Sequence, residues 1–465
     1  MTETRRESDA MGEVEMPAGA LYGPQTARAV ANFPVSGWMM PPEVIAALGH
    51  IKLAAAEVNK RGGGLDAARA DAIAAAAADV ADGTLDAHFP VDVFQTGSAT
   101  STNMNANEVI ARRAEHLLRQ RGAADPAVHP NDHVNRAQSS NDVIPTALRI
   151  AAAGAIRRRL GPALRSLRDA LAAKAGQFDD VVKIGRTHLM DAVPVRLGQE
   201  FGGYAAGVDA AAEAIDRAAE GLHQVPIGGT AVGTGLNAPP KFGAAMCRQL
   251  SELTGLPVRE APDRFAAQSL RDAALLTTGA LRNAATTLGK IASDLRLLGS
   301  GPRCGLGELR LPAVQPGSSI MPGKVNPVLC ESVVQVACQV AGCDAAIAAG
   351  CAGGVGGILE LNVAMPMIAW NLLTEIRLLT NVAGAFERGC VRGIEPDRAR
   401  CGELVERSLA TVTALTPKIG YDRAAGIAQR AHAEGKTVRD ICLAEGVLTA
   451  DELDALLDAR QQTRQ

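Results

Sequence analysis

Long stretches of this chain place apolar residues at helical spacing and contain few prolines. Alanine, leucine, arginine and glutamate are abundant in them, and these residues have the best helix propensities. Aromatic residues make up only 3% of the chain, which argues against extensive strands. The pattern therefore predicts a mainly α-helical protein. The longest predicted helical segments are Thr146–Phe178, Gly198–Gln224, Arg264–Ser300, Val328–Ala349 and Pro366–Arg388.

These predicted helices have little polar surface. In the segment that begins at Arg264, apolar residues follow roughly helical spacing at Phe265, Leu270, Ala274, Leu281 and Leu288. Much of the opposite face is alanine, threonine and glycine. Such a helix packs against neighbours on several sides. We therefore expect five long helices to form a bundle that packs against other bundles in an oligomer, the alternative being an extended monomeric helical protein.

Shorter elements are expected on both sides of this bundle. We predict three domains: an N-terminal domain of residues 1–141, a central helical-bundle domain of residues 142–394, and a small C-terminal helical domain of residues 395–465. No repeat at the period of a solenoid occurs, which argues against a repeat array.

The charge balance and the N-terminus limit the expected partners and location. Lys and Arg number 47 against 50 Asp and Glu, and the chain has no basic tract. Nucleic acid and membrane surfaces are therefore not expected partners. The N-terminus lacks an apolar signal core, and no uninterrupted apolar run is long enough to span a bilayer, so we expect a soluble cytoplasmic protein.

The residues that usually bind metals are not clustered in the sequence. The nine cysteines are scattered without a CxxC pair, which indicates neither a disulfide framework nor a zinc cluster, and we expect most of them to be buried. No HExxH motif occurs, and His129 and His133 lie in a context that does not favour helix. No strand-linked GxGxxG motif occurs either. We expect no metal and no nucleotide cofactor, which leaves acid-base or nucleophilic catalysis by side chains.

Five polar stretches interrupt the helical pattern. They are Phe94–Ala111, His129–Ala147, Gly185–Phe201, Gly228–Pro239 and the loop GSSIMPGKVNPVLCE at Gly317–Glu331. They offer hydroxyls, carboxamides and backbone amides near helix starts, and these donors suit carboxylate oxygens. The last loop is not a phosphate loop, because five residues separate Gly317 from Gly323 and a valine follows Lys324.

Each motif also has a purely structural interpretation. Ser139, Ser140 or Asn141 could cap the helix that follows. Asn326 before a proline likewise fits a helix start, with Glu331 at the favourable end of the helix dipole.

The remaining candidates are also ambiguous when taken singly. His188 alone could be a partly buried histidine with satisfied hydrogen bonds, and Lys324 alone could be a solvated lysine. The Gly228–Pro239 stretch could be a simple backbone turn. Capping does not require five loops with the same chemistry, however, and caps and ligand sites can share atoms.

Taken together, the five stretches resemble a known family. GSSIMPGKVNP is similar to the signature of the fumarase/aspartase superfamily, and the chain from about Arg5 to Ala459 looks like a class II fumarate hydratase. The motifs TGSATSTNMNANEV, HPND followed by QSSND, GRTHLMDA, GGTAVGTGLN and ELNV occur in the family's order. The resemblance implies a three-domain homotetramer with a twenty-helix core and active sites shared between three subunits.

Two positions favour a hydratase over an ammonia lyase. Fumarases resemble RTHLxDA and MPGKVN, as read here at His188 and Gly323, whereas aspartases typically carry Gln and Ala there. The resemblance therefore implies reversible hydration of fumarate to (S)-malate in the tricarboxylic acid cycle. The alternatives are an aspartate or related amino-acid ammonia lyase and a noncatalytic helical oligomer, and the retention of every proposed catalytic residue argues against the latter.

The resemblance also assigns roles to residues. Ser318 is implied as the base that removes the C3 proton of malate, with Lys324 and Asn326 binding the carboxylate that becomes an aci-carboxylate. His188, paired with Glu331, would position and protonate the departing water. The residues implied to hold the substrate carboxylates are Ser98, Thr100, Ser139, Ser140, Asn141 and Thr187.

Two departures from the family pattern stand out. Ala99 replaces the glycine of the usual GSGT, and we expect little effect because Ser98 and Thr100 remain. A second anion site near His129, Asn131 and Asp132 is implied, but Asp125, Pro126 and Ala127 precede it where a basic residue usually helps. We therefore expect weak or absent dicarboxylate binding there.

Overall fold

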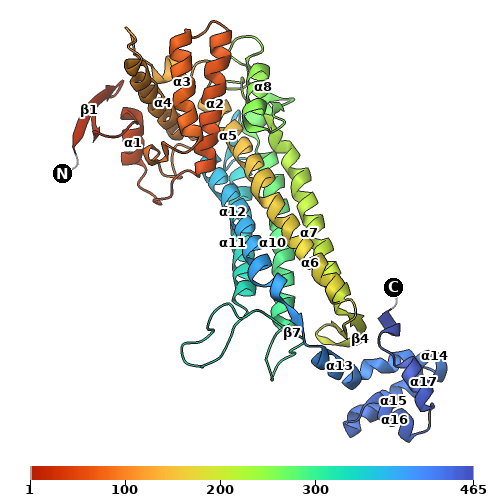
Figure 1. Ribbon diagram of the computed structural model, residues 1–465. Helices are drawn as coiled ribbons and strands as arrows, with labels where there is room; N and C mark the ends of the chain where they lie inside the picture. Colours follow the sequence, from red (N-terminus) through yellow and green to blue (C-terminus); the bar gives the residue numbers. More distant parts are fainter. Residues whose placement is uncertain (1–2, 464–465) are drawn as a thin grey trace. The chain divides into compact units, whose positions relative to one another are not determined.

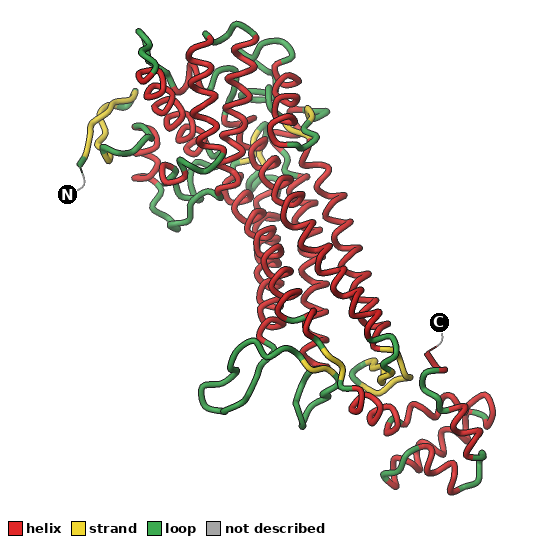
Figure 2. Tube along the Cα trace, in the orientation of Figure 1, coloured by secondary structure: helices red, strands yellow, loops and turns green. Residues whose placement is uncertain are grey.

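The computed structural model describes residues 3–463 and is mainly helical, which confirms the predicted fold class (Figures 1 and 2). Contacts divide the chain into two compact units. The first unit comprises the chain up to Pro162 together with Glu213–Asn283 and Cys338–Thr380. The second comprises Ala163–Ala212, Ala284–Ala337 and the chain from Asn381 onward. The three-domain division stays a prediction.

The first unit contains seven complete α-helices among its described residues. They are α1 (Pro24–Asn32), α2 (Pro42–Arg61), α3 (Ala67–Ala81), α4 (Thr100–Gln120), α5 (Ser140–Ala155), α8 (Phe242–Thr254) and α9 (Arg264–Ser269). Helices α2, α3 and α4 lie side by side (Figure 1). At Gly49 a β-carbon would lie 2.5 Å from the amide nitrogen of Ala81, so glycine permits the close approach of α2 to α3.

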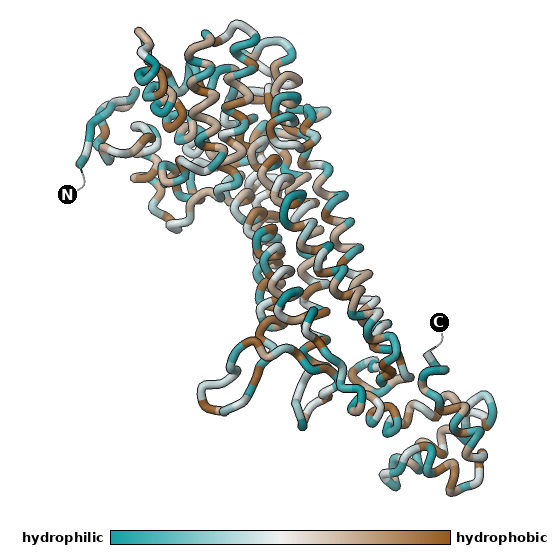
Figure 3. The backbone as a smooth tube through the Cα atoms, in the orientation of Figure 1, coloured by the Kyte–Doolittle hydropathy of each residue, from teal (hydrophilic) through white to brown (hydrophobic). Residues whose placement is uncertain are grey.

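Five long helices begin in one unit and end in the other. They are α6 (Gly161–Gln177), α7 (Leu197–Ala219), α10 (Asp272–Leu298), α11 (Val328–Cys351) and α12 (Met365–Gly389). Apolar positions recur along them and are interleaved with polar ones (Figure 3). Each of them lies within or overlaps one of the five predicted helical segments, although α6 covers only the second part of Thr146–Phe178, whose first part belongs to α5 and η3 (Ile156–Leu160).

The complete helices of the second unit lie near the C-terminus. They are α13 (Arg398–Arg407), α14 (Thr416–Ile419), α15 (Tyr421–Glu434), α16 (Val438–Ala444) and α17 (Ala450–Leu456). Leu415, Ile427, Ile441 and Leu453 are buried in one apolar cluster, which holds these short helices together.

The strands form short pairs. Antiparallel pairs join β1 (Thr4–Asp9) to β2 (Gly12–Pro17), β3 (Val182–Thr187) to β4 (Met190–Arg196), β7 (Leu309–Arg310) to β10 (Glu395–Pro396), and β8 (Gly357–Ile358) to β9 (Leu361–Asn362). The parallel pair is β5 (Gln224–Val225) with β6 (Arg259–Glu260).

Shorter helical turns connect these elements. The 3₁₀ turns are η1 (Asp86–His88), η4 (Glu220–His223), η5 (Val391–Gly393), η6 (Leu409–Leu415) and η7 (Gln461–Thr463). Two π turns, η2 (Pro130–Val134) and η3 (Ile156–Leu160), complete the set, and η3 joins α5 to α6.

Two sequence predictions about helix lengths are wrong. The N-terminal region does not consist of short elements, because α2 and α4 have 20 and 21 residues. The segment Arg264–Ser300 is not one helix, because Leu270 is extended and ends α9. The guanidinium of Arg271 donates to the Ala267 carbonyl at 2.5 Å and takes the place of the backbone amide that would bond there in a continuous helix.

Helix α11 is long and apolar enough, by length and composition alone, to cross a membrane, although only 33% of its most apolar window is buried. The sequence analysis, which found no apolar run long enough to span a bilayer, considered uninterrupted runs alone. Helix α11 is not such a run, because it contains Glu331 and Asp344. Its exposed residues between Gln335 and Ala349 are mostly small: Cys338, Ala341, Gly342, Ala345, Ala348 and Ala349.

Six of the nine cysteines are buried, as predicted, and no candidate metal cluster occurs among the described residues.

Candidate active site

The predicted site residues fall into two groups, one in each compact unit. The first unit contains Ser98, Thr100, His129, Asn131, Asp132, Ser139, Ser140 and Asn141, and the second contains Thr187, His188, Ser318, Lys324, Asn326 and Glu331. The geometry of each group is described separately below.

Ser139 caps α5. Its hydroxyl accepts a hydrogen bond from the amide of Asn141, and its own amide donates to Asp142 Oδ1 at 2.9 Å, which completes a capping box. The structural interpretation of QSSND is therefore correct. It does not exclude ligand binding, because Ser139 and Ser140 also line a cavity.

Asp142 joins this helix start to the Gly228–Pro239 stretch. Its Oδ2 accepts hydrogen bonds from the amides of Gly228 and Thr230, each at 2.9 Å. The side chain of Asn141 donates to the Ala231 carbonyl at 2.8 Å. Burial raises the pKa of Asp142 to about 6, although the three backbone hydrogen bonds oppose this shift. The glycine-rich stretch is more than a turn, because Thr230 and Asn237 within it line the same cavity as Ser139 and Ser140.

A buried lysine supports the same region from α2. Lys52 is fully buried and donates to Asn135 Oδ1 at 2.9 Å and to Gln138 Oε1 at 3.0 Å. Burial lowers its pKa to about 7, and the charge of Asp142 opposes that shift. Asn103 donates to Ser140 Oγ at 3.1 Å. Sequence reasoning missed Lys52 and Asp142, although Asp142 lies within a motif that it identified.

These side chains border a cavity of about 950 Å³. Its polar lining includes Asn103, Asn131, Asp132, Asn135, Arg136, Gln138, Ser139, Ser140, Thr230 and Asn237. Hydroxyl and carboxamide groups predominate, and the lining carries the positive charge of Arg136 and the negative charge of Asp132. The lining is suited to a small carboxylate.

Ser98 and Thr100 lie at the start of α4 with their hydroxyl oxygens 2.8 Å apart. Ala99 between them is fully buried and has a φ of 53°, in the left-handed region that favours glycine. The backbone of Ala99 is thus strained. The sequence analysis expected this replacement of glycine to have little effect, and it did not include the strain.

The expected second anion site is arranged around His129. Its Nδ1 accepts a hydrogen bond from the amide of Asp132 at 3.1 Å. Arg69 lies beside the residues that precede this site and donates to the Ala127 carbonyl at 2.9 Å. Arg69 also forms ion pairs with Asp66 and Asp125, so its charge is compensated. Weak anion binding at this site stays a prediction.

In the second unit, Thr187 and His188 lie at the exposed tip of the β3–β4 hairpin. His188 and Leu189 have φ values of 56° and 62°, and both precede Met190, which pairs with Thr187. Two positive φ values are typical of a type I′ turn, which usually contains Asn-Gly or other residues that tolerate this conformation. A leucine there is strained. The hairpin thus presents His188 to solvent in a costly backbone conformation.

The Gly317–Glu331 loop is closed on itself. The amide of Gly317 donates to the Lys324 carbonyl at 2.7 Å, and Asn326 Nδ2 donates to the Gly317 carbonyl at 2.7 Å. A β-carbon at position 317 would lie 2.7 Å from the Lys324 carbonyl oxygen, so this closure requires glycine.

The hydroxyl of Ser318 lies inside this loop. Ser318 Oγ accepts hydrogen bonds from the amides of Ile320 at 3.2 Å and Met321 at 2.9 Å. Glu331 is half-buried in the first turn of α11. Within residues 3–463, no ion pair or hydrogen bond joins Glu331 to His188, so their pairing stays a prediction.

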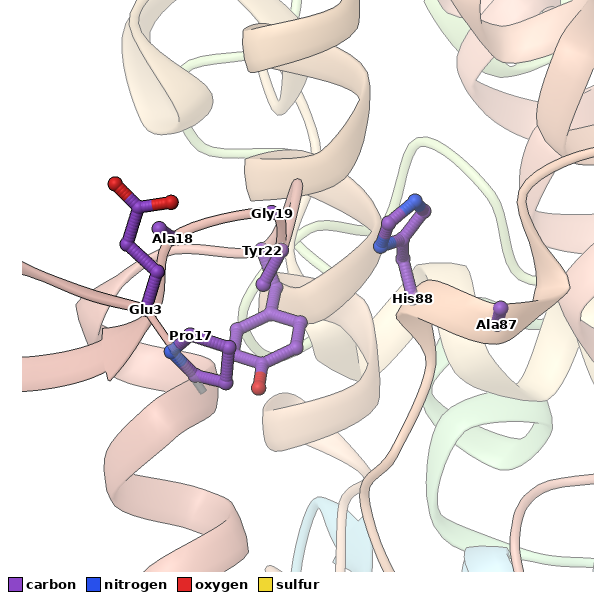
Figure 4. Close-up of a pocket in the computed structure, with 8 residues that line it drawn as sticks. Glu3, Pro17, Ala18, Gly19, Tyr22, Ala87 and His88 are labelled. Atoms are coloured by element: carbon purple, nitrogen blue, oxygen red, sulfur yellow. The ribbon is translucent and has the colours of Figure 1, made fainter. Parts of the chain in front are cut away.

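A separate cavity of about 390 Å³ lies near the N-terminus and contains none of the predicted site residues (Figure 4). Glu3, Tyr22 and His88 contribute its polar side chains. His88 Nδ1 accepts a hydrogen bond from the amide of Leu21 at 3.3 Å, which gives this histidine a structural role.

Comparisons with known proteins identify the family. A lyase family model matches residues 12–342, and a model of the fumarase C C-terminus matches residues 412–464. A class II fumarate hydratase from Chromobacterium violaceum is 52% identical over 456 residues, which cover 98% of both chains. This chain belongs to the class II fumarate hydratase family.

Other members of the class II fumarate hydratase family extend the match. The mitochondrial fumarate hydratase 1 of Arabidopsis thaliana is 50% identical, over 98% of this chain and 92% of the relative. The crystal structure of the class II fumarase from Schistosoma mansoni superposes with a TM-score of 0.94 at 39% identity, over 99% of both chains. Family membership places this chain among the lyases and confirms the resemblance read from its loops.

Replacing Ala99 with glycine should stabilise this member of the class II fumarate hydratase family. Glycine removes the left-handed strain, so the free energy of unfolding should rise by about 1 kcal/mol. The matched control is Ala106→Gly in the middle of α4. This substitution should lower the free energy of unfolding by about 1 kcal/mol or more. Chemical denaturation of both variants tests this. A decrease for Ala99→Gly would contradict the strained conformation.

Asp142→Asn should separate the start of α5 from the Gly228–Pro239 stretch. Asparagine has one acceptor oxygen where aspartate has two, so buried backbone amides lose their acceptor at a cost of about 1–3 kcal/mol each. Hydrogen exchange at Gly228 and Thr230 should accelerate and the melting temperature should fall. Asp263→Asn is the control, since asparagine is an equally good helix cap there. Unchanged exchange in Asp142→Asn would refute this role.

Proposed function

We propose that this chain catalyses the reversible, stereospecific hydration of fumarate to (S)-malate, as a step of the tricarboxylic acid cycle. Its relatives at about 50% identity are named fumarate hydratases. The observation that carries the chemical assignment is the pair of backbone amides that donate to Ser318 Oγ. The reaction needs a small dicarboxylate substrate and, in this proposal, no metal or other cofactor.

Ser318 is the proposed base that removes the C3 proton of malate. A serine hydroxyl is a weak base near neutral pH, so its alkoxide must be stabilised. The amides of Ile320 and Met321 already point at the oxygen that would carry this charge, and Lys324 adds a positive charge to the same loop. Donors that already point at this oxygen stabilise its negative charge without having to move during the reaction.

Lys324 and Asn326 are the proposed partners of the carboxylate that becomes an aci-carboxylate. Removing the C3 proton places a second negative charge on that group, and a cation with an amide donor stabilises it selectively in the transition state. Asn326 uses one amide hydrogen to close the loop on Gly317, and a carboxamide nitrogen has a second one for substrate.

The remaining predicted residues complete the proposed site. Ser98, Thr100, Ser139, Ser140, Asn141 and Thr187 hold the substrate carboxylates in this proposal. His188, oriented by Glu331 in this proposal, positions and protonates the departing water. A general acid must lie within hydrogen-bond reach of the group that it protonates, and a carboxylate partner holds an imidazole in that position.

We also infer that the active enzyme is a homotetramer with a twenty-helix core. Helix α11 exposes a face of small residues, and on α10 the side chain of Leu276 is 66% exposed. Small residues let helices approach closely, and covering these faces would remove apolar surface from water. We place this enzyme in the cytoplasm, although the Arabidopsis relative is described as mitochondrial.

Ser318→Ala should lower kcat for malate dehydration by about 10²- to 10⁴-fold, the usual contribution of a general base. Ser319→Ala is the matched control, because Ser319 is its exposed neighbour in the same loop. The kcat of both variants is measured from the absorbance of the fumarate that forms from malate. A kcat for Ser318→Ala within about threefold of that of Ser319→Ala would rule out Ser318 as the base.

Shared sites make a second prediction. Ser318→Ala and His188→Asn subunits, each nearly inactive alone, should regain part of the wild-type activity after subunit exchange, because some sites would receive both intact loops. Exchange is verified by mass spectrometry of differently tagged chains. No recovery after verified exchange would mean that each chain supplies both residues to the same site.

A further inference from the structure

Four charged side chains of the second unit form a cluster with two buried and two half-buried members. Arg186 Nη1 donates to Glu308 Oε2 at 2.8 Å, and Lys183 Nζ lies 3.6 Å from the same oxygen. Lys183 also donates to Glu200 Oε1 at 2.9 Å. Glu308 is fully buried and Lys183 is 1% exposed. Two positive and two negative groups balance, which makes their burial tolerable.

The cluster links the two segments that carry the proposed acid and base. Lys183 and Arg186 lie on β3, and Arg186 directly precedes Thr187 and His188. Glu308 lies at the start of the segment that leads through β7 to Ser318. None of these four residues has a role in the proposed chemistry.

The backbone of Glu308 is fixed as firmly as its side chain. Its amide donates to the Leu298 carbonyl at the end of α10 at 2.9 Å, and its carbonyl accepts from the amide of Asp397 at 2.9 Å. The carboxylate is therefore held at a defined place relative to α10 and α13, and it can act as an anchor for a less rigid element.

The β3–β4 hairpin needs such an anchor. His188 and Leu189 at its tip are exposed and have left-handed backbone conformations, which persist only when the surroundings impose them. The register of the two strands also shifts between Ile184 and Arg186, so the ladder is interrupted just before the tip. The ion pair of Arg186 with Glu308 lies between this irregularity and the tip.

We infer that Glu308 is a positioning residue for the hydratase reaction: through Arg186 it fixes the hairpin that presents Thr187 and His188. This inference rests on the function proposed for His188. Glu308 Oε2 accepts from Arg186 and lies beside Lys183, so Glu308 acts on the rate through the position of the hairpin. Glu200 shares Lys183 with Glu308, but within residues 3–463 no hydrogen bond or ion pair joins Glu200 to Arg186, so the chain contains its own comparison.

The test compares Glu308→Gln with Glu200→Gln in the full-length protein. Both substitutions keep the shape of the side chain and remove one negative charge beside Lys183. We expect kcat for fumarate hydration to fall by about 10- to 100-fold in Glu308→Gln, because small misplacement of a catalytic group costs rates of this order, and to change less than threefold in Glu200→Gln. Hydrogen exchange of amides 186–191 should accelerate only in Glu308→Gln.

A double substitution separates positioning from general destabilisation. If Glu308 acts through Arg186, Glu308→Gln combined with Arg186→Gln should lower kcat no further than the more severe single variant. Multiplicative losses would contradict the inference. If Glu308→Gln does not fold, Arg186→Gln alone is compared with Glu200→Gln by the same two measurements.

The hydrogen-exchange result is independent of the proposed function. A wild-type protein that does not hydrate fumarate would overturn the function, whereas faster exchange in amides 186–191 of Glu308→Gln would still support Glu308 as the anchor of the hairpin. Equal exchange and equal kcat in Glu308→Gln and Glu200→Gln would overturn the inference, even in an active hydratase.

Discussion

Buried carboxylates hold the polar loops of this protein in place. Asp142 binds amides at the start of α5 and in the Gly228–Pro239 stretch, and Glu308 binds Arg186 beneath the β3–β4 hairpin. Glu108 binds the amides of Gly23 and Thr26 at the start of α1. Burying a carboxylate is costly unless donors surround it, so each carboxylate fixes the donors around it. Loops without regular hydrogen bonding thereby acquire defined positions.

The polar groups that the anchored loops offer to the proposed reaction differ between the two units. The first unit supplies hydroxyls and carboxamides around its cavity, while the second supplies Ser318, Lys324 and His188. The proposed reaction needs both sets, because binding a dicarboxylate does not remove its proton and a base without positioned substrate is ineffective. The exposed small-residue face of α11 provides a physical reason for chains to associate.

Much of the fold could be read from the sequence, and the reasons for the failures are specific. Alanine-rich periodicity identified the five long helices, and the QSSND pattern identified the cap at Ser139. The break at Leu270 could not be predicted, because it depends on a buried arginine side chain that replaces a backbone donor. Among the candidate residues, local patterns identified the loops but not Lys52 or Glu308, whose partners are distant in the sequence.

The most direct test of the central claim is the absorbance of fumarate incubated with purified, chelator-treated protein, with and without ammonium. A metal-independent hydratase should consume fumarate in ammonia-free buffer and form malate. Consumption only with ammonium would identify an ammonia lyase and show that His188 does not determine hydratase specificity. No consumption in either buffer would contradict the proposed function and favour a noncatalytic oligomer or another dicarboxylate substrate.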